Sequence, residues 1–89
     1  MANFKEFEII LKALGSKRRL AIIRYIQKRK EATVGEVAEE IRISIKSTSK
    51  HLVMLKKADI LEREQRGMQA AYFMSPALPE LAQGIIKLL

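Results

Sequence analysis

The chain has 89 residues, 48% of them hydrophobic, and a net charge of +7. A single domain over residues 1–89 is expected to build one core with little room for a deep catalytic cleft, and its hydrophobic content argues against disorder. The basic excess favours an anionic partner, with nucleic acid ahead of a membrane surface. The absence of cysteine excludes disulfides and thiolate metal sites.

The sequence shows neither a membrane span nor a signal peptide. No apolar run approaches the roughly 18 residues of a membrane span. The N-terminal segment MANFKEFE lacks the basic region and apolar stretch of a signal peptide. We therefore expect a cytoplasmic protein.

Two helices are predicted first. Apolar residues at helical spacing indicate a helix over residues 3–14, which Gly15 ends. Ser16 is then placed to cap a second helix over residues 17–29. The apolar positions of these helices are Phe4, Phe7, Leu11 and Leu14, followed by Leu20, Ile23 and Ile26, with Ala21, Ile22 and Tyr25 at the margins of the second stripe.

A tight helical corner follows. Thr33 and Glu36 have the spacing of a capping box and open a third helix that runs through Ile41. Ser44 is placed to cap a fourth helix over residues 45–57. Because only two residues separate these helices, the segment predicts a helix-turn-helix.

The remaining elements are a hairpin and a last helix. Residues 60–64 and 70–74 are predicted to be short strands, with Arg66 and Gly67 in the loop between them. The last helix is expected to start at Ser75 and Pro76, with Pro79 tolerated at its fourth position. The predicted fold is thus mainly α with a small β-hairpin: a winged helix-turn-helix of four helices, two strands and one helix.

The fourth helix carries lysines and no acid. At 100° per residue, its outward stripe contains Lys46, Lys50, Val53 and Lys57, whereas Thr48, Leu52 and Leu55 face the core, with Ile45 near the boundary. Such a helix suits the major groove of DNA, where lysine contacts to phosphate are expected ahead of contacts to bases. The alternative is a solvated face whose lysines serve solubility. The DNA-binding residues predicted on this helix and its cap are Ser44, Lys46, Ser47, Ser49, Lys50, His51 and Lys57.

Three further features bear on this interface. His51, the only histidine, is expected to be a half-buried packing residue at the edge of the core that donates to a phosphate. The basic second helix offers contacts to the DNA backbone, although Arg19 has the alternative of pairing with an acid inside the domain. On the hairpin, Arg66 is expected at the loop tip, in reach of a minor groove or phosphate, provided that Glu62 and Glu64 face away from DNA. The DNA-binding residues predicted on the hairpin are Arg63, Gln65, Arg66 and Gln69.

The segments LKALGSKRRLAIIRYI, ISIKSTSKHLVMLKKADIL and RGMQAAYFM resemble the ArsR-type winged-helix repressors, over about residues 4–74. The resemblance implies a DNA-binding regulator that acts as a homodimer. Asp59 stands where the family usually has a glycine after the recognition helix. The glycine of the family's hairpin loop corresponds to Gly67, and Met68 stands where the family has an arginine after it. The cysteine pair of some members is absent, because the chain has no cysteine. The histidine–carboxylate zinc site of other members is absent too, because the last helix offers only Glu80 and Gln83 as possible ligands. Metal sensing by those routes is excluded, and no cofactor is expected.

The first and last helices have apolar faces that a small core covers only in part. We expect these faces to form a homodimer interface; the alternative is that the two helices pack on each other within one monomer. The predicted interface residues are Phe4, Phe7, Leu11, Leu81, Ile85, Leu88 and Leu89.

The leading hypothesis is a homodimeric, sequence-specific repressor that binds double-stranded DNA. The alternative is a winged-helix module for protein–protein interaction in a transcription-related complex. An enzyme is rejected because the sequence has no metal-ligand cluster, no glycine-rich phosphate loop and no nucleophile beside a base. RNA binding is disfavoured because the few aromatic residues are mostly expected in the core.

Overall fold

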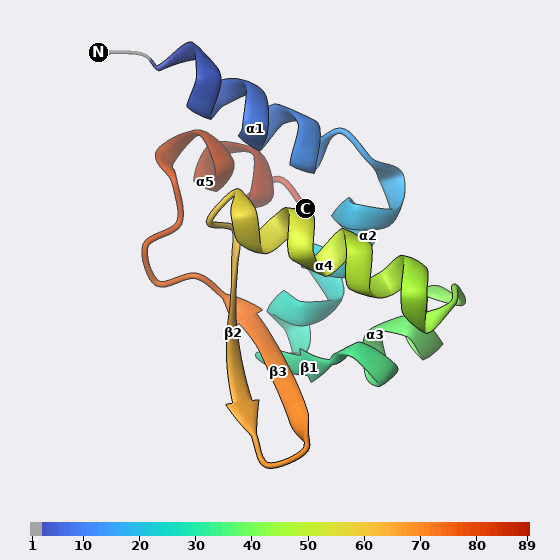
Figure 1. The fold of residues 1–89 in the computed structure, drawn as a ribbon. Helices are drawn as coiled ribbons and strands as arrows, with labels where there is room; N and C mark the ends of the chain where they lie inside the picture. The colour runs from blue at the N-terminus through green and yellow to red at the C-terminus, as the bar shows by residue number, and fades with distance from the viewer. Residues whose placement is uncertain (1–2) are drawn as a thin grey trace.

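The computed structural model describes residues 3–89, which form five helices and a three-stranded antiparallel sheet (Figure 1). The elements in chain order are α1 (Phe4–Leu14), α2 (Lys17–Arg29), β1 (Glu31–Thr33), α3 (Val34–Ile41), α4 (Ile45–Lys57), β2 (Leu61–Arg66), β3 (Gln69–Met74) and α5 (Glu80–Ile86). The predicted winged helix-turn-helix is confirmed.

Short polar side chains set the helix starts. The Oδ1 of Asn3 accepts from the Glu6 amide at the start of α1, and the Ser16 hydroxyl accepts from the Arg19 amide at the start of α2. Each such cap satisfies an amide that has no partner within the helix. The bounds of α2 and α4 agree with the prediction, and α1 begins one residue later than expected because Asn3 is its cap.

The capping box of α3 is also confirmed. The Thr33 hydroxyl accepts from the Glu36 amide at 3.2 Å, and the Glu36 carboxylate accepts from the Thr33 amide at 2.8 Å. The hydrogen bond from the Thr33 amide is the main cause that lowers the pKa of Glu36, and nearby Arg29 lowers it further. The carboxylate therefore stays charged where the N-terminal end of a helix dipole favours it.

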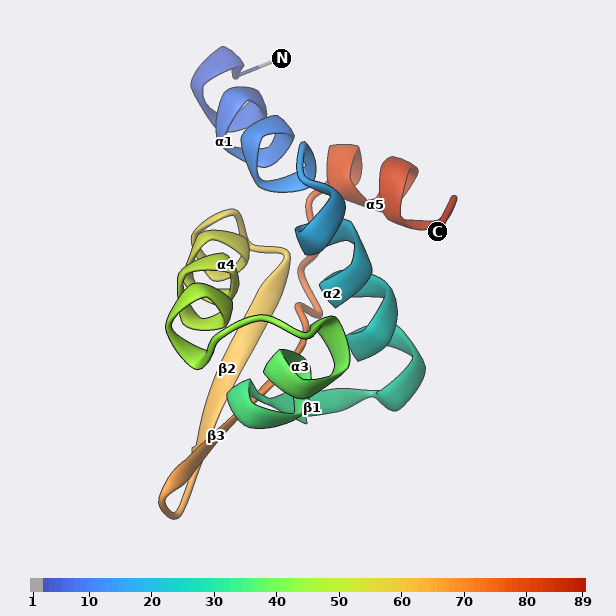
Figure 2. The same cartoon turned by 90° about the vertical axis from the view of Figure 1, so that its right-hand side faces the viewer.

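The sheet has the strand order β1–β3–β2. The short strand β1 was not predicted; it pairs with β3 through Glu31 with Phe73 and Thr33 with Ala71. The hairpin of β2 and β3 is longer than predicted and closes through a two-residue turn at Gly67 and Met68, where Gly67 adopts φ 62°. Residues 61–74 form the wing. Figures 1 and 2 show the tip of the wing projecting beyond the helices, at the end of the molecule away from α1 and α5.

One core lies between the helices and the inner face of the sheet. The fully buried side chains from α2, α4 and β2 include Ile22, Ile23, Ile26, Leu52, Leu55 and Leu61. Ile22, predicted at the margin of the α2 stripe, is completely buried, so the stripe is wider than expected. The N-terminal α1 joins the same core through Ile10 and α5 through Ala82 and Ile86.

The predicted start of the last helix is wrong. The chain leaves β3 through an irregular segment, and α5 begins only at Glu80, with Pro79 as its N-terminal flanking residue. Proline disfavours the helical conformation of the residue before it and has no amide to donate. A helix that started at Pro76 would have needed the disfavoured helical conformation at Leu78 and a backbone amide that Pro79 lacks. The helix therefore starts after the second proline.

Candidate nucleic-acid interface

The inward face of α4 fixes which side chains it presents to solvent. Leu52 and Leu55 are completely buried, as is Thr48, whose hydroxyl donates to the Ser44 carbonyl at 2.8 Å. These contacts hold α4 in one rotation about its axis. The three lysines predicted to meet DNA, Lys46, Lys50 and Lys57, are consequently all exposed on the opposite side.

The serines of α4 divide by role. The Ser44 hydroxyl accepts from the Ser47 amide at 3.0 Å and so caps the helix, although the residue remains exposed. Ser47 and Ser49 are half-buried. Ser44 therefore has a structural task besides the predicted contact with DNA.

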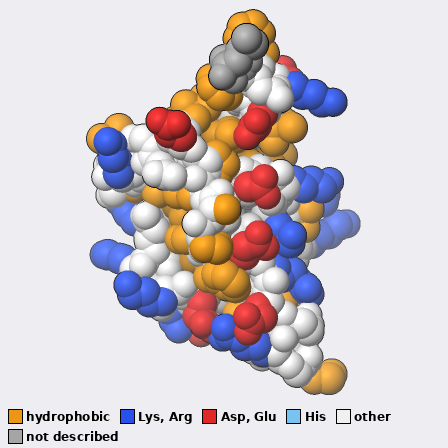
Figure 3. All heavy atoms as spheres, turned by 90° about the vertical axis from the view of Figure 1, so that its left-hand side faces the viewer, with side chains coloured by type: hydrophobic (Ala, Val, Ile, Leu, Met, Phe, Trp, Pro, Cys, Tyr) orange, Lys and Arg blue, Asp and Glu red, His pale blue; other side chains and the backbone are white. Residues whose placement is uncertain are grey.

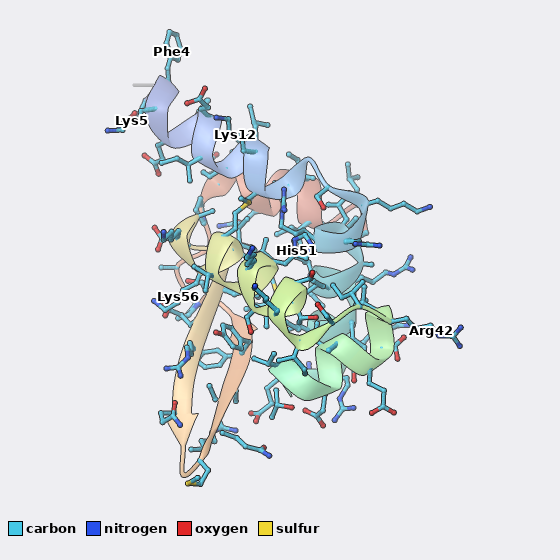
Figure 4. The ribbon with its side chains drawn as sticks, turned by 45° about the vertical axis from the view of Figure 1, so that its right-hand side comes forward. Phe4, Lys5, Lys12, Arg42, His51 and Lys56 are labelled. Atoms are coloured by element: carbon cyan, nitrogen blue, oxygen red, sulfur yellow. The ribbon has the colours of Figure 1, made fainter. Side chains whose placement is uncertain are left out.

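The corner between α3 and α4 is closed by the backbone. Arg42 adopts the left-handed conformation with φ 63°, and its amide and that of Ile43 both donate to the Ala38 carbonyl. The Arg42 side chain points away from the body of the molecule at this end (Figure 4). Because only three residues, Arg42, Ile43 and the cap Ser44, lie between α3 and α4, the two helices keep a fixed relative orientation.

Arg19 connects three elements through one side chain. Its Nε and Nη2 atoms donate to the carbonyls of Ala13 and Lys12 at the end of α1, at 2.7 and 2.8 Å. Its Nη1 lies 3.0 Å from Nδ1 of His51 on α4, and Figure 4 shows His51 directed from α4 towards the junction of α1 and α2. The expected alternative, an ion pair between Arg19 and an acid, is wrong, because its partners are two carbonyl oxygens and an imidazole.

His51 is half-buried, as predicted, and its environment favours the neutral ring. Burial lowers the pKa of His51, and the charges of Arg19 and then Arg18 lower it further. With Arg19 donating to Nδ1, the proton of the neutral imidazole is assigned to Nε2. Nε2 is thus the ring atom available to donate to a phosphate.

The wing residues do not form one surface. In the β2–β3 register, Arg63 and Gln65 share a face with the buried Leu61, whereas Arg66 and Gln69 lie on the opposite face with Glu64. All four predicted residues are exposed, but the alternation of the strands separates them into two pairs.

Arg66 is held by acids of the wing and β1. Its guanidinium forms ion pairs with Glu64 at 2.9 Å and with Glu31 of β1. The hydrogen bonds that the guanidinium donates to these two carboxylates, Glu64 first, raise the pKa of Arg66 above its ordinary value. Arg66 lies at the end of β2 rather than in the loop, so the expected position at the loop tip is wrong, and Met68 occupies that tip with 99% of its surface exposed.

The basic residues of α2 are also partly engaged. Arg29 donates to the Tyr25 hydroxyl and to Glu36, both at 2.9 Å. Arg18, Arg24 and Lys28 are exposed. The α2 helix therefore presents fewer available cations than the sequence suggested.

The predicted interface residues of the first and last helices are only partly covered within the monomer, and two of them, Leu88 and Leu89, lie beyond the end of α5 at Ile86. The helices α1 and α5 do contact each other, and Ile10, Ala82 and Ile86 lie in one core. This agrees with the alternative to a dimer, in which the first and last helices pack on each other within one monomer. Yet Phe4 is 83% exposed, Leu11 51% and Leu88 80%, and Figure 4 shows Phe4 projecting from the end of α1. Phe7 and Leu89 are also exposed, whereas Leu81 and Ile85 pack at the edge of the core.

The face viewed in Figure 3 has a different character from the lysine face of α4. Acidic and apolar side chains occupy its middle, and Lys and Arg lie mainly along its edges.

Among residues 3–89, no group of three or more His, Asp or Glu side chains is arranged to hold a metal ion. Over the same residues, each helix is too short or too polar to cross a membrane.

Sequence reasoning missed the roles of two residues at this interface. Arg19 was predicted to contact DNA or to pair with an acid, and its actual partners were missed because they lie at the end of another helix and on α4. Ile45 was placed near the core boundary, but it is 56% exposed at the first position of α4. Its position as the first residue of the helix was a usable signal, since no preceding turn covers it.

Comparisons with known proteins agree with this geometry. A family model described as "Helix-turn-helix domain" matches residues 14–64. The transcriptional regulator HlyU from Vibrio vulnificus is 26% identical, with a TM-score of 0.75 over 97% of this chain and 85% of that one. The transcriptional repressor PagR of Bacillus anthracis is 24% identical, with a TM-score of 0.77 over 96% and 93%.

A third structure carries the family name given above. Mb0332 from Mycobacterium bovis, described as a homodimeric winged helix-turn-helix DNA-binding domain and a possible ArsR-family regulator, is 22% identical, with a TM-score of 0.80 over 99% of this chain and 85% of that one. The predicted resemblance to the ArsR-type winged-helix regulators is thereby confirmed at the level of the fold. No protein of curated function matches the chain by sequence.

Proposed function

The chain belongs to a helix-turn-helix domain family, and from this premise we propose that it is a homodimeric, sequence-specific repressor that reads double-stranded DNA with α4. The observation that carries the proposal is the composition and placement of α4. Its core face is fixed by Leu52, Leu55 and Thr48, and its outer face presents lysines with no acid.

The physical basis is the match between this helix and the major groove. The groove admits an α-helix, and recognition helices approach base edges with their N-terminal residues. Lys46 and Lys50 are exposed on the first two turns, where they reach phosphate or guanine, and Lys57 extends the cationic stripe. The wing contributes Arg63 and Gln65, which lie on the same face of β2 as the buried Leu61.

A homodimer is proposed from the apolar surface of α1 and of the C-terminal residues that follow α5. Phe4, Leu11 and Leu88 leave large apolar areas in solvent, and burying such side chains is favourable by about 1.5–3 kcal/mol each. A two-fold dimer through this surface presents each contact twice. In the helix-turn-helix geometry it places two copies of α4 about 34 Å apart, which calls for a pseudo-palindromic operator.

The test is selection of bound duplexes from a random pool, together with sedimentation of the protein without DNA. We expect an inverted repeat with half-sites one helical turn apart, and a dimer that Leu11→Glu converts to a monomer. Val53→Glu, which changes a similarly exposed aliphatic residue on α4, is the control and should remain dimeric. Enrichment of a single half-site with a monomeric wild type would contradict the homodimer.

The competing function is docking to another protein, and salt distinguishes the two. A protein that contacts several phosphates loses DNA affinity steeply as salt rises, because bound counterions are released. A DNA affinity that hardly changes with salt, with no enriched duplex, would overturn the proposal and favour the docking module.

A further inference from the structure

One apolar side chain interrupts the polar start of α4. Ile45 is the first residue of the helix, lies between the exposed Ser44 and Lys46, and has 56% of its surface in solvent. It belongs neither to the core nor to the residues packed against the core. The fold therefore does not use this side chain for its own packing.

The backbone beneath Ile45 is nevertheless fixed. The Ser44 hydroxyl caps the helix through the Ser47 amide, and the Ser44 carbonyl accepts from both the amide and the hydroxyl of Thr48. Thr48 is completely buried. An exposed isoleucine is consequently held in a defined place at the end of α4 that approaches base edges, rather than on a mobile segment.

The chemistry of the groove supplies one partner for such a side chain. The base edges of the major groove are hydrogen-bonding groups with a single apolar exception, the 5-methyl group of thymine. Ile45 has no hydrogen bond to offer, and it would leave the amino group of a cytosine desolvated without an acceptor. By contrast, the lysines and serines of α4 bond to several bases or to phosphate and discriminate less.

We propose that Ile45 is a specificity-determining residue, which selects thymine at the base pair facing the start of α4 by covering its 5-methyl group. This inference rests on the proposed reading of DNA by α4. It names the base that the operator carries at that position, which the proposed function leaves open.

The test uses the selected duplex and replaces one thymine at a time in one half-site by deoxyuridine, which removes only the methyl group. At one position, wild-type protein should lose about fourfold in affinity, since burial of one such group contributes about 0.8 kcal/mol and 1.4 kcal/mol corresponds to tenfold. Ile45→Ala should bind the parent duplex more weakly and should not distinguish thymine from deoxyuridine there. Its salt dependence should equal that of the wild type, because no phosphate contact is lost.

Val53→Ala is the matched control. Val53 is also an exposed aliphatic residue of α4, at 46%, but lies eight residues further on, about 12 Å along the axis at 1.5 Å per residue. It should retain the wild-type discrimination at the position that Ile45→Ala loses. Wild-type indifference to every deoxyuridine, or unchanged discrimination by Ile45→Ala, overturns the inference alone. Failure to enrich any duplex overturns the proposed function and the inference with it.

Discussion

The α4 helix and the wing use their charges in different ways. Four lysines and no acid lie on α4, and within the described residues 3–89 only Lys56 of these has an acidic partner, Glu62 at 3.9 Å. The wing has two arginines and two glutamates, and Arg66 is bound by Glu64 and by Glu31 of β1. The net charge of +7 is therefore not spread evenly over the predicted interface: α4 offers available cations, whereas the wing has as many glutamates as arginines and its Arg66 is held in ion pairs.

The largest effect is expected from α4. The double variant Lys46→Ala with Lys50→Ala should fold normally and lose roughly a hundredfold in DNA affinity, at about 1.4 kcal/mol per charged contact. The slope of log affinity against log salt should become shallower by about 1.8, or 0.9 per phosphate. Fluorescence anisotropy at several salt concentrations measures both quantities.

The control for this variant removes the same charge elsewhere. Lys5→Ala with Lys12→Ala changes two exposed lysines of α1, which Figure 4 shows away from α4. It should retain most of the affinity. Equal losses in the two double variants would mean that total charge, rather than the face of α4, determines binding.

A smaller effect of opposite sign is expected at the wing. Glu31→Gln with Glu64→Gln removes the two charges that hold Arg66 and should make that guanidinium available to phosphate. DNA affinity should rise several-fold, and the salt slope should steepen by about 1. Glu6→Gln with Glu8→Gln on α1 makes the same change in charge away from the wing. If both pairs raise affinity equally, the wing has no specific part in the effect.

Ser44 allows the cap and the DNA contact to be separated. Ser44→Ala should cost about 1 kcal/mol of unfolding free energy in urea, because the Ser47 amide loses its acceptor. Ser44→Asp keeps a capping oxygen and should retain stability, but it should weaken DNA binding by adding a negative charge at the start of α4. A stable Asp variant with undiminished affinity would show that Ser44 lies away from the duplex. Ser49→Ala, which removes a hydroxyl without a capping role, should leave stability unchanged.

The smallest effect concerns pH and His51. Its pKa is lowered in the folded protein, so the unfolded chain binds a proton at higher pH than the native state does. This contribution to stability is complete above about pH 6.5, the ordinary histidine value, and is lost as the pH falls towards the lowered folded pKa. Thermal unfolding should show less stability at pH 5.5 than at pH 7.5. His51→Gln, which keeps an acceptor for Arg19 but does not titrate, should reduce this difference, and an unchanged difference would assign it to other groups.

Local chemistry made much of the fold predictable. Ser16, Thr33 and Ser44 each precede an apolar periodic segment, and each caps a helix as expected. Asp59, which stands where the resembled family usually has glycine, adopts the left-handed conformation with φ 60°. These features depend on residues within four positions of each other, which a sequence displays directly.

The errors share a dependence on distant partners. The three-residue β1 forms because it pairs with β3, some 40 positions later. The residues Glu31–Thr33 by themselves give no pattern that predicts a strand. Arg66 finds Glu31 across 35 positions, and Arg19 finds His51 across 32. The start of α5 was the exception, because Pro79 gave a local signal against a helix through Leu78.

The closed corner between α3 and α4 has a consequence for the operator itself. With Arg42 and Ile43 both bonded to Ala38, and Ser44 bonded to Ser47 and Thr48, the protein has little freedom to adjust the angle at which α4 enters a groove. Any mismatch between the two half-sites must then be taken up by the double helix. Pyrimidine–purine steps such as TA and CA bend most readily, so base pairs that no side chain touches should also contribute to the choice of site.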